Sequence, residues 1–286
     1  MKLLALIEHC SARLQEAGVS FGHGTTNAFD EAVWLALWRL GLPLDDLDSV
    51  ADRTLTAAQC AAVEALVEQR IRTRKPAAYL TGEAWLQGLP FHVDERTIVP
   101  RSLIAEVLAE GLIDDWLQAP PSRVLDLCTG NGSLAVLAAL AWPQSVVDAT
   151  DLSAEALAVA QRNVDRHGLV TRIRLRQGDG LAAAEGRYDL VLCNPPYVNR
   201  ASMGRLPPEY RAEPALALDG GDDGMHFVRP LLSGVARHLE PQGMLVLEIG
   251  HERVHFEAAF AHLQPVWLPT SAGDDQVLLL TREALA

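Results

Sequence analysis

The stretch Arg123-Val124-Leu125-Asp126-Leu127-Cys128-Thr129-Gly130-Asn131-Gly132-Ser133 decides the fold. Its first five residues predict a short buried strand, and the next six predict a tight glycine turn. The apolar residues 134–141 then predict a helix. Strand, glycine turn and helix form the first unit of a doubly wound nucleotide-type sheet. Because glycines let the backbone approach a ligand and the helix N-terminus faces it, we predict a ligand cleft at this turn.

The next strand supplies an acid at the same edge of the sheet. Residues 146–151 predict that strand, and they end in Asp151, 19 positions after Gly132. A carboxylate at this place suits a ribose diol. A helix over 154–167 follows, and a strand over 172–176 leads to Gly178-Asp179. The pattern predicts a nucleoside-containing ligand, and a nicotinamide dinucleotide fits Gly130-x-Gly132-x-x-Ala135 with Asp151 as well as S-adenosylmethionine does.

A second motif, Asn194-Pro195-Pro196-Tyr197, follows the apolar strand predicted over 188–193. The two prolines end that strand, because proline donates no ladder hydrogen bond and has a fixed φ. An amide and an aromatic ring therefore lie on a stiff corner at the carboxyl end of a strand, where open α/β sheets bind ligands. An ordinary proline turn would have the same local sequence, and the glycine turn upstream is what favours a functional site.

Three features favour S-adenosylmethionine over a dinucleotide. Asp126 stands in the strand four residues before Gly130, where it could meet the amino-acid end of that cofactor. The chain ends in two strands, 266–268 and 276–280, which predict an antiparallel hairpin rather than further parallel units. The third feature is the proline motif itself. Between the proline motif and the C-terminal hairpin we predict a helix over 225–239, a strand over 243–249 and a helix over 253–261.

The first 75 residues predict a small helical domain. Asn27 or Thr26 caps its second helix, and Thr56 caps a third over 55–71. Arg70, Arg72, Arg74 and Lys75 close this domain, either as a solvated helix end or as a docking site for RNA or a substrate segment. Residues 76–98 predict a linker with a β-hairpin around Gln87-Gly88, whose first strand spans 79–85. Residues 99–286 form the α/β domain, beginning with a helix over 103–117 capped by Ser102.

Composition limits the partners. The formal net charge is -13, and residues 76–286 hold 16 basic against 27 acidic residues. That balance argues against a broad nucleic-acid footprint and suits a basic partner. The four cysteines are scattered without zinc spacing, and the acidic run 219–224 lacks the spacing of a calcium loop, so we predict no metal. No apolar run approaches membrane length, and we expect a cytoplasmic protein with reduced thiols.

At these motifs the sequence resembles a known family. Asp126-x-x-Thr129-Gly130-x-Gly132, Asp151 and Asn194-Pro195-Pro196-Tyr197 are similar to class I methyltransferases that act on planar amide or amine nitrogens. The helical N-terminal domain and hairpin linker narrow the resemblance to the HemK group of glutamine methyltransferases. One branch modifies the Gly-Gly-Gln loop of peptide release factors, and the other modifies a glutamine of ribosomal protein uL3. Val99-Pro100-Arg101-Ser102 resembles the second branch.

The resemblance implies S-adenosylmethionine as cofactor and assigns the site. The expected cofactor-binding residues are Asp126, Cys128, Thr129, Gly130, Asn131, Gly132, Asp151, Asp179 and Asn194. The expected substrate-binding residues are Asn194, Pro195, Pro196 and Tyr197, and of these Asn194, Pro195 and Tyr197 are the catalytic ones. Two positions depart from the release-factor branch: Cys128 replaces Gly, and Gly180 replaces an aromatic residue that packs on adenine. Leu181 or Asp179 could supply that contact instead.

The resemblance also sets the expected partners. The expected substrate is a basic ribosomal protein, either free or within an assembling large subunit. Three alternatives remain open at this point: the release-factor loop, an adenine amine of a nucleic acid, and a non-catalytic role in ribosome assembly.

Overall fold

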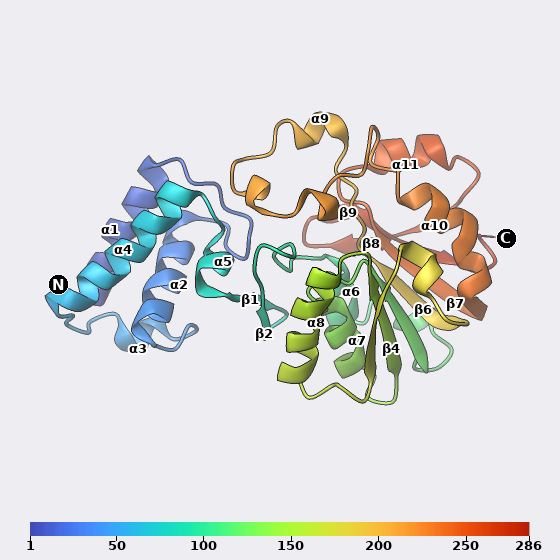
Figure 1. Ribbon diagram of the computed structural model, residues 1–286, viewed down its shortest axis with the longest axis horizontal. Helices are drawn as coiled ribbons and strands as arrows, with labels where there is room; N and C mark the ends of the chain where they lie inside the picture. Colours follow the sequence, from blue (N-terminus) through green and yellow to red (C-terminus); the bar gives the residue numbers. More distant parts are fainter. Residues whose placement is uncertain (286) are drawn as a thin grey trace. The chain divides into compact units, whose positions relative to one another are not determined.

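The computed structural model describes residues 1–285, which divide into two compact units. The helical unit contains residues 1–84 together with the later segment 206–212. The sheet unit contains residues 85–205 and 213–286. The chain therefore leaves the sheet unit after Arg205 and returns to it at Glu213. Figure 1 shows the elements of each unit.

The helical unit is built from five helices. They are α1 (Leu3–Glu16), α2 (Ala28–Leu40), α3 (Leu47–Val50), α4 (Ala57–Thr73) and α5 (Ala77–Thr81). Asn27 caps α2 by accepting a hydrogen bond from the Asp30 amide, and Thr56 and Gln59 form a capping box at the start of α4. Leucine, valine and alanine side chains on one face of α1, α2 and α4 form its apolar core.

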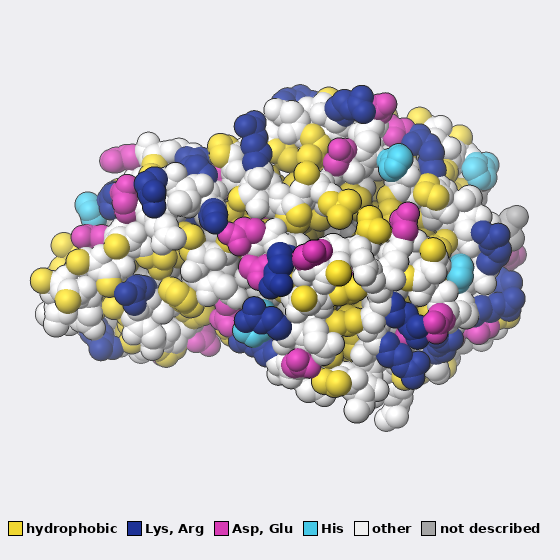
Figure 2. Space-filling model, viewed as in Figure 1, with side chains coloured by type: hydrophobic (Ala, Val, Ile, Leu, Met, Phe, Trp, Pro, Cys, Tyr) yellow, Lys and Arg dark blue, Asp and Glu magenta, His cyan; other side chains and the backbone are white. Residues whose placement is uncertain are grey.

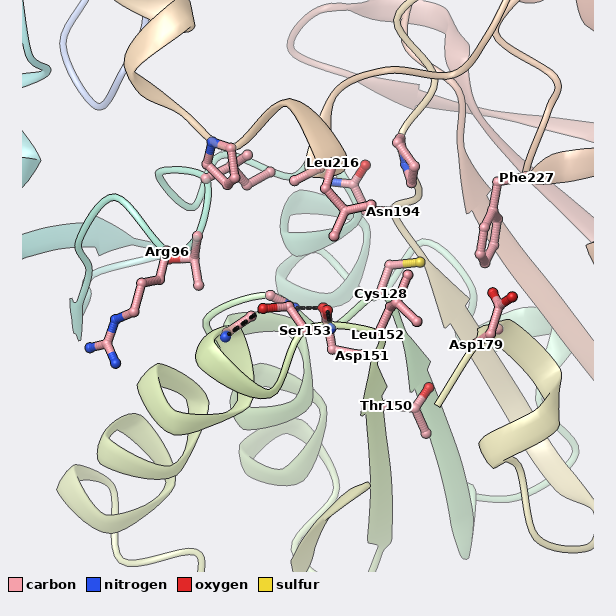
Figure 3. A pocket seen from close by; sticks show the side chains of 18 of the residues that line it. Arg96, Cys128, Thr150, Asp151, Leu152, Ser153, Asp179, Asn194, Leu216 and Phe227 are labelled. Carbon is pink, nitrogen blue, oxygen red and sulfur yellow. Dashed lines mark hydrogen bonds between the residues drawn. The ribbon is translucent and has the colours of Figure 1, made fainter. Parts of the chain in front are cut away.

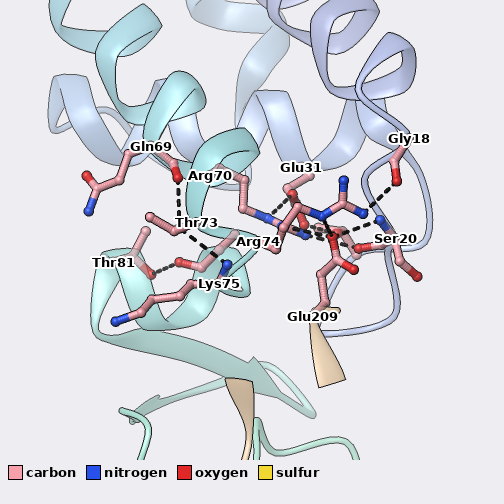
Figure 4. A network of polar contacts seen from close by, with 12 residues as sticks. Gly18, Ser20, Glu31, Gln69, Arg70, Thr73, Arg74, Lys75, Thr81 and Glu209 are labelled. Atoms are coloured by element: carbon pink, nitrogen blue, oxygen red, sulfur yellow. Dashed lines mark hydrogen bonds and ion pairs between the residues drawn. The ribbon is translucent and has the colours of Figure 1, made fainter. Parts of the chain in front are cut away.

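The basic cluster that closes α4 is only partly a solvated helix end, because Arg72 is exposed whereas Arg70 is not. Arg70 is fully buried, and its guanidinium donates to Glu31 Oε1 at 2.8 Å, to the Ser20 carbonyl at 3.0 Å and to Glu209 Oε1 at 3.3 Å. Arg74 pairs with Glu209 Oε1 at 2.7 Å (Figure 4). The prediction of a solvated side chain is therefore wrong for Arg70. The local sequence gives no sign that Glu209, 139 positions later, lies beside α4.

A two-stranded hairpin, β1 (Glu83–Leu86) and β2 (Leu89–His92), follows the helices. Gln87 and Gly88 form its turn, and both have positive φ. The predicted start of β1 at Tyr79 is wrong, because residues 77–81 form α5, which ends at Gly82 with φ 71°.

The sheet unit is a seven-stranded mixed sheet in the order β5-β4-β3-β6-β7-β9-β8. The strands are β3 (Arg123–Leu127), β4 (Val146–Asp151), β5 (Ile173–Gln177), β6 (Tyr188–Cys193), β7 (Leu239–Glu248), β8 (Val266–Thr270) and β9 (Gly273–Thr281). The first five in the order are parallel, and β9 and β8 form an antiparallel hairpin at the edge. The predicted class I methyltransferase fold with its C-terminal hairpin is confirmed.

Helices cover both faces of this sheet. The first face packs on α6 (Ile104–Ala109) and α7 (Ser133–Ala141) and includes Val124 of β3. The second packs on α10 (Val228–Gly234) and α11 (Arg253–Ala259) and includes Leu125 of β3. Neighbouring residues of one strand thus point to opposite cores. The remaining helices are α8 (Ala154–Arg166) and the short α9 (Arg200–Met203).

Two predicted helices are shorter than expected. The helix predicted over 103–117 ends at Ala109, because Gly111 adopts φ 65° and only a 3₁₀ turn at Asp114–Trp116 follows. The helix predicted over 225–239 is α10 followed by a 3₁₀ turn over Val235–His238. Within residues 1–285, each helix is too short or too polar to span a bilayer.

Candidate active site

A cleft of about 820 Å³, measured with the solvent space at its mouth, lies at the carboxyl ends of the parallel strands. This size suits a nucleoside-containing ligand. Of the predicted site residues, the cleft is lined by Cys128, Gly130, Asp151, Asp179, Asn194 and Pro196 (Figure 3). In the space-filling view, hydrophobic side chains gather over the middle of the sheet unit, with acidic and basic side chains interspersed around them (Figure 2).

Asp126 supports the glycine turn and does not line the cleft. It is fully buried, and its Oδ2 accepts hydrogen bonds from Thr129 Oγ1 at 2.5 Å and from the Ala135 amide at 3.1 Å. Burial raises the pKa of Asp126 to about 7, against the opposing effect of these donors. The carboxyl group thus ties the end of β3 to the first turn of α7.

The same turn is also shaped by Thr129, Asn131 and Gly132, which do not line the cleft. The Gly132 amide donates to the Thr129 carbonyl at 2.8 Å, and the Asn131 carbonyl accepts from Asn163 of α8 at 2.8 Å. Gly132 has φ 81°, and a Cβ there would meet Ala160 Cβ at 3.1 Å. This residue is glycine because the backbone conformation and the packing of α8 both exclude a side chain.

Asp151 lies at the centre of the cleft, where Figure 3 draws it beside Ser153. Its Oδ2 accepts from the Gly130 amide and its Oδ1 from the Ser153 amide, each at 2.9 Å. Burial raises the pKa of Asp151, although these backbone donors oppose the shift. An ionised carboxylate offers about four lone pairs, so acceptor capacity remains for hydroxyl groups of a ligand.

The aromatic wall of the cleft comes from Phe227, which sequence reasoning missed. Gly180 has φ 50°, and a Cβ there would lie 3.5 Å from two atoms of the Phe227 ring. Phe227 stands immediately before α10, 47 positions beyond Gly180. Leu181 instead packs in the apolar core, while Asp179 is exposed at the rim of the cleft. The one signal in the sequence was Gly180 itself: a glycine at a position where an aromatic residue was expected indicates that another residue supplies the aromatic contact.

Asn194 and Pro196 line the cleft at the end of β6, whereas Pro195 is buried and falls outside the lining. After the proline motif, the backbone of Val198 forms two hydrogen bonds with residues 218–220. The Val198 amide donates to the Leu218 carbonyl at 2.8 Å, and the Gly220 amide donates to the Val198 carbonyl at 2.9 Å. These bonds hold the proline corner against a second loop of the sheet unit.

Three glycines surround Tyr197. A Cβ on Gly220 would lie 2.7 Å from Tyr197 Cα, one on Gly224 would lie 2.4 Å from its carbonyl oxygen, and one on Gly250 would lie 2.5 Å from ring atom Cε2. Each of these distances is too short for a real side chain, so the glycines let the backbone close on Tyr197. Gly220 and Gly224 of the run 219–224 therefore make room for Tyr197.

The acidic side chains of the same run have partners of their own. Asp222 pairs with Arg200 at 2.5 Å, and Asp223 forms an ion pair with Arg229. Among residues 1–285, the structure holds no cluster of three His, Cys, Asp or Glu side chains suited to a metal ion.

Arg101 holds one wall of the cleft in place. Its guanidinium donates to Glu213 Oε1 at 2.6 Å and to Oε2 at 2.7 Å, and the Val99 amide donates to Oε1 at 2.9 Å. Glu213 is buried, and the residues after it, Pro214, Leu216 and Ala217, line the cleft. A bidentate pair of this kind fixes geometry as well as contributing binding energy, so residues 99–101 set the position of this wall.

Comparison with known proteins gives the family. Residues 105–205 match the methyltransferase small domain, and residues 5–82 match the PrmC N-terminal domain. The ribosomal protein uL3 glutamine methyltransferase of Bordetella pertussis is 56% identical to the chain over 285 residues, which are 98% of this chain and 95% of the relative. The chain belongs to the uL3 glutamine methyltransferase family.

Another uL3 glutamine methyltransferase, from Burkholderia pseudomallei, is 52% identical over 96% of this chain and 92% of its own length. Among solved structures, a methyltransferase from Pyrococcus furiosus has a TM-score of 0.51 at 20% identity and covers 75% of this chain and 97% of its own. That likeness shows the class I fold alone. Membership of the family also makes the chain an enzyme that uses S-adenosylmethionine as methyl donor.

The cleft described above fits that cofactor. The Asp151 carboxylate suits a pair of vicinal hydroxyls, and Gly130, with φ 56° and no atom closer than 4.0 Å to a Cβ built on it, leaves the backbone open to a ligand. Leu152 is 49% exposed and lines the cleft with Phe227, so apolar surface is available for a purine. This combination of apolar walls and few polar groups is typical of a nucleoside site.

Proposed function

We propose that this enzyme transfers a methyl group from S-adenosylmethionine to the side-chain amide nitrogen of a glutamine in ribosomal protein uL3. The observation that supports it most directly is the position of Asn194. This amide lines the cofactor cleft at the end of β6, together with Cys128 after the neighbouring strand β3 and Asp151 at the end of β4, one strand further along the sheet. An amide acceptor at this place can hold a planar nitrogen next to the bound methyl donor.

The proposed cofactor site combines contact and support residues. Cys128, Gly130, Asp151, Asp179 and Asn194 line the cleft and contact the cofactor, with Asp151 on the ribose. Asp126, Thr129, Asn131 and Gly132 act through the shape of the turn. Phe227 joins this set as the residue that packs on the adenine. When bound, S-adenosylmethionine supplies an electrophilic methyl group on its sulfonium.

The acceptor nitrogen needs orientation more than deprotonation. Its lone pair is delocalised into the carbonyl, so it is a poor nucleophile until the geometry favours attack. The Asn194 side-chain oxygen accepts one N–H of the glutamine, and the backbone carbonyl of Pro195 accepts the other. Proline suits this role because its fixed φ aims the carbonyl. Pro196 stiffens the corner, and Tyr197 packs on the amide plane.

A strong base is unnecessary before the transfer. The amide proton becomes acidic only as the new N–C bond forms, so the two acceptors can take up the developing charge. Most of the rate gain is then positioning, which is worth about 7–11 kcal/mol in well-oriented reactions.

The proposal extends to the partner. The helical unit contributes to substrate recognition, and the substrate is basic uL3, free or within an assembling large subunit in the cytoplasm. The charge of the enzyme, -13 at pH 7, supports attraction of a basic protein and disfavours a nucleic-acid substrate.

The test is transfer of labelled methyl to three substrates in parallel: free uL3, a peptide release factor and duplex DNA. We expect label in uL3, and we expect it to disappear when the target glutamine is replaced by alanine. Label in the release factor alone would reject the substrate and keep the chemistry. Label in DNA alone would reject the amide acceptor and leave the fold and cofactor.

A further inference from the structure

Ser102, Glu248 and Tyr197 form a chain of hydrogen bonds that the proposed reaction does not use. The Ser102 hydroxyl donates to Glu248 Oε2 at 2.6 Å, the Leu103 amide donates to the same oxygen at 2.9 Å, and the Tyr197 hydroxyl donates to Oε1 at 3.0 Å. Glu248 is the last residue of β7, and Ser102 follows Arg101, which holds the wall of the cleft. The chain of bonds therefore joins the segment 99–102 to the proline motif.

Stability alone gives no reason for a carboxylate here. Glu248 is 3% exposed, and burial raises its pKa against the opposing hydrogen bonds from Ser102 and Tyr197. Among residues 1–285, the ion pairs of the structure give Glu248 no basic partner. A buried charge without a counter-ion is destabilising, and a neutral side chain of similar size would cost less free energy.

A second tyrosine, in the strand that leads into the proline motif, provides a contrast. Tyr188, at the start of β6, donates its hydroxyl to the buried Asp148 at 2.9 Å. Asp148, however, pairs with Arg123 at 2.9 Å and lies 3.7 Å from Arg176. The structure thus neutralises the carboxylate that lies away from the cleft and leaves the one beside the proline motif without a cation.

The bond from Glu248 completes the constraints on Tyr197. Gly220 and Gly224 enclose its backbone, and Gly250 lies against one edge of its ring. These contacts restrict translation of the ring, and the hydroxyl bond to Glu248 restricts its tilt. Tyr197 is three residues after Asn194 on the same stiff corner. A change in the position of the Tyr197 ring would therefore move the Asn194 amide or the substrate glutamine that this amide binds.

We infer that Glu248, held by Ser102, is a positioning residue for methyl transfer. It acts by fixing the ring of Tyr197 against the amide plane of the substrate glutamine. The inference rests on the proposed function and deepens it. It gives the segment 99–102 two tasks: Arg101 places the cofactor wall through Glu213, and Ser102 places the acceptor motif through Glu248.

The test uses the full-length enzyme in single-turnover transfer to uL3 with cofactor saturating. The variants are Tyr197→Phe, Glu248→Gln and Ser102→Ala. The matched control is Tyr188→Phe at the start of β6, which removes a tyrosine hydroxyl that also donates to a buried carboxylate and accepts from the Glu185 amide. Cofactor affinity is measured by calorimetry, and rates are normalised to the fraction that binds cofactor. Because a misplacement of about 1 Å can cost about 100-fold, we expect the Tyr197 and Glu248 variants to lose about 10- to 100-fold in rate.

The expected pattern separates positioning from stability. Cofactor affinity should stay within about twofold in all variants, and Tyr188→Phe should lower thermal stability while keeping the wild-type rate. Tyr197→Phe combined with Glu248→Gln should be no slower than the slower single variant, because both break the same bond. Should Glu248→Gln fail to fold, Tyr197→Phe and Ser102→Ala decide the question, since each removes only one hydroxyl.

Normal transfer by Tyr197→Phe and Ser102→Ala would overturn the inference, as would losses that match the control or that lie in cofactor affinity. A wild-type enzyme that labels no glutamine in uL3 would overturn the proposed function, and the inference with it. The two failures are therefore distinguishable.

Discussion

Replacing Arg70 with methionine removes a cation from the centre of the helical unit. Arg70, Glu31 and Glu209 are 0%, 1% and 0% exposed. The guanidinium donates to both carboxylates and to the Ser20 carbonyl. After the substitution Glu31 keeps the Thr25 hydroxyl as a donor but has lost its buried cation. Breaking a buried ion pair from one side typically costs about 3–5 kcal/mol, and we expect the helical unit to lose that much.

Hydrogen exchange measures this loss where it occurs. At about 1.4 kcal/mol per factor of ten, protection of amides in α1, α2 and α4 should fall by about two to three and a half powers of ten. Strands β3, β4 and β6 of the sheet unit provide an internal reference. Arg72→Met is the matched control, because Arg72 lies in the same helix and is exposed. It should change stability by no more than about 0.5 kcal/mol.

Two further results would bear on the reasoning. Adding Glu31→Gln to Arg70→Met should restore part of the protection, since Glu31 then carries no uncompensated buried charge and Glu209 keeps Arg74 as its partner. Equal protection in the Arg70 and Arg72 variants would refute the buried cluster and return the segment to a solvated helix end.

Four other predictions follow from the sheet unit. Asn194→Ala should abolish methyl transfer while keeping most of the cofactor affinity, because the other lining residues still hold the cofactor, and lost affinity with normal turnover would reject its assignment. Asp151→Ala should weaken cofactor binding first, and unchanged affinity by calorimetry would mean that another group holds the ribose. Phe227→Leu should cost about 1–3 kcal/mol of cofactor affinity if its ring packs on the base, whereas an unchanged affinity would place the adenine elsewhere. Burial raises the pKa of Asp126 to about 7, while an unfolded aspartate titrates near about 4. The contribution of Asp126 to the free energy of unfolding should therefore decrease as the pH rises from about 4 to about 7. In urea unfolding, Asp126→Asn should lack this decrease. Parallel pH curves for the wild type and the variant would contradict the prediction.

Local patterns predicted the sheet and its glycine turn well. Strand, turn and helix at residues 123–141, the acid at Asp151 and the proline corner at Asn194 are each encoded by a few neighbouring residues. Because parallel strands present their carboxyl ends at one edge, sequence order was enough to bring Asp151 and Asn194 to the same cleft. The C-terminal hairpin also followed from its spacing.

Features that depend on distant segments were not predicted. Phe227 reaches the place left open by Gly180 from a different element, and Glu248 meets Tyr197 from β7. Arg70 looked like a surface residue because its second acid, Glu209, belongs to a loop far along the chain. In each case the chemistry depends on tertiary packing, and no local periodicity records it.

The return of residues 206–212 to the helical unit has a consequence for synthesis on the ribosome. The first 84 residues emerge early, but the carboxylate of Glu209 arrives about 130 residues later. At about 5–20 residues per second, Arg70 and Arg74 wait roughly 6–25 s for this partner. The N-terminal helices must therefore collapse first around their apolar core and complete their charged interior only after the glycine turn and the proline corner have left the ribosome.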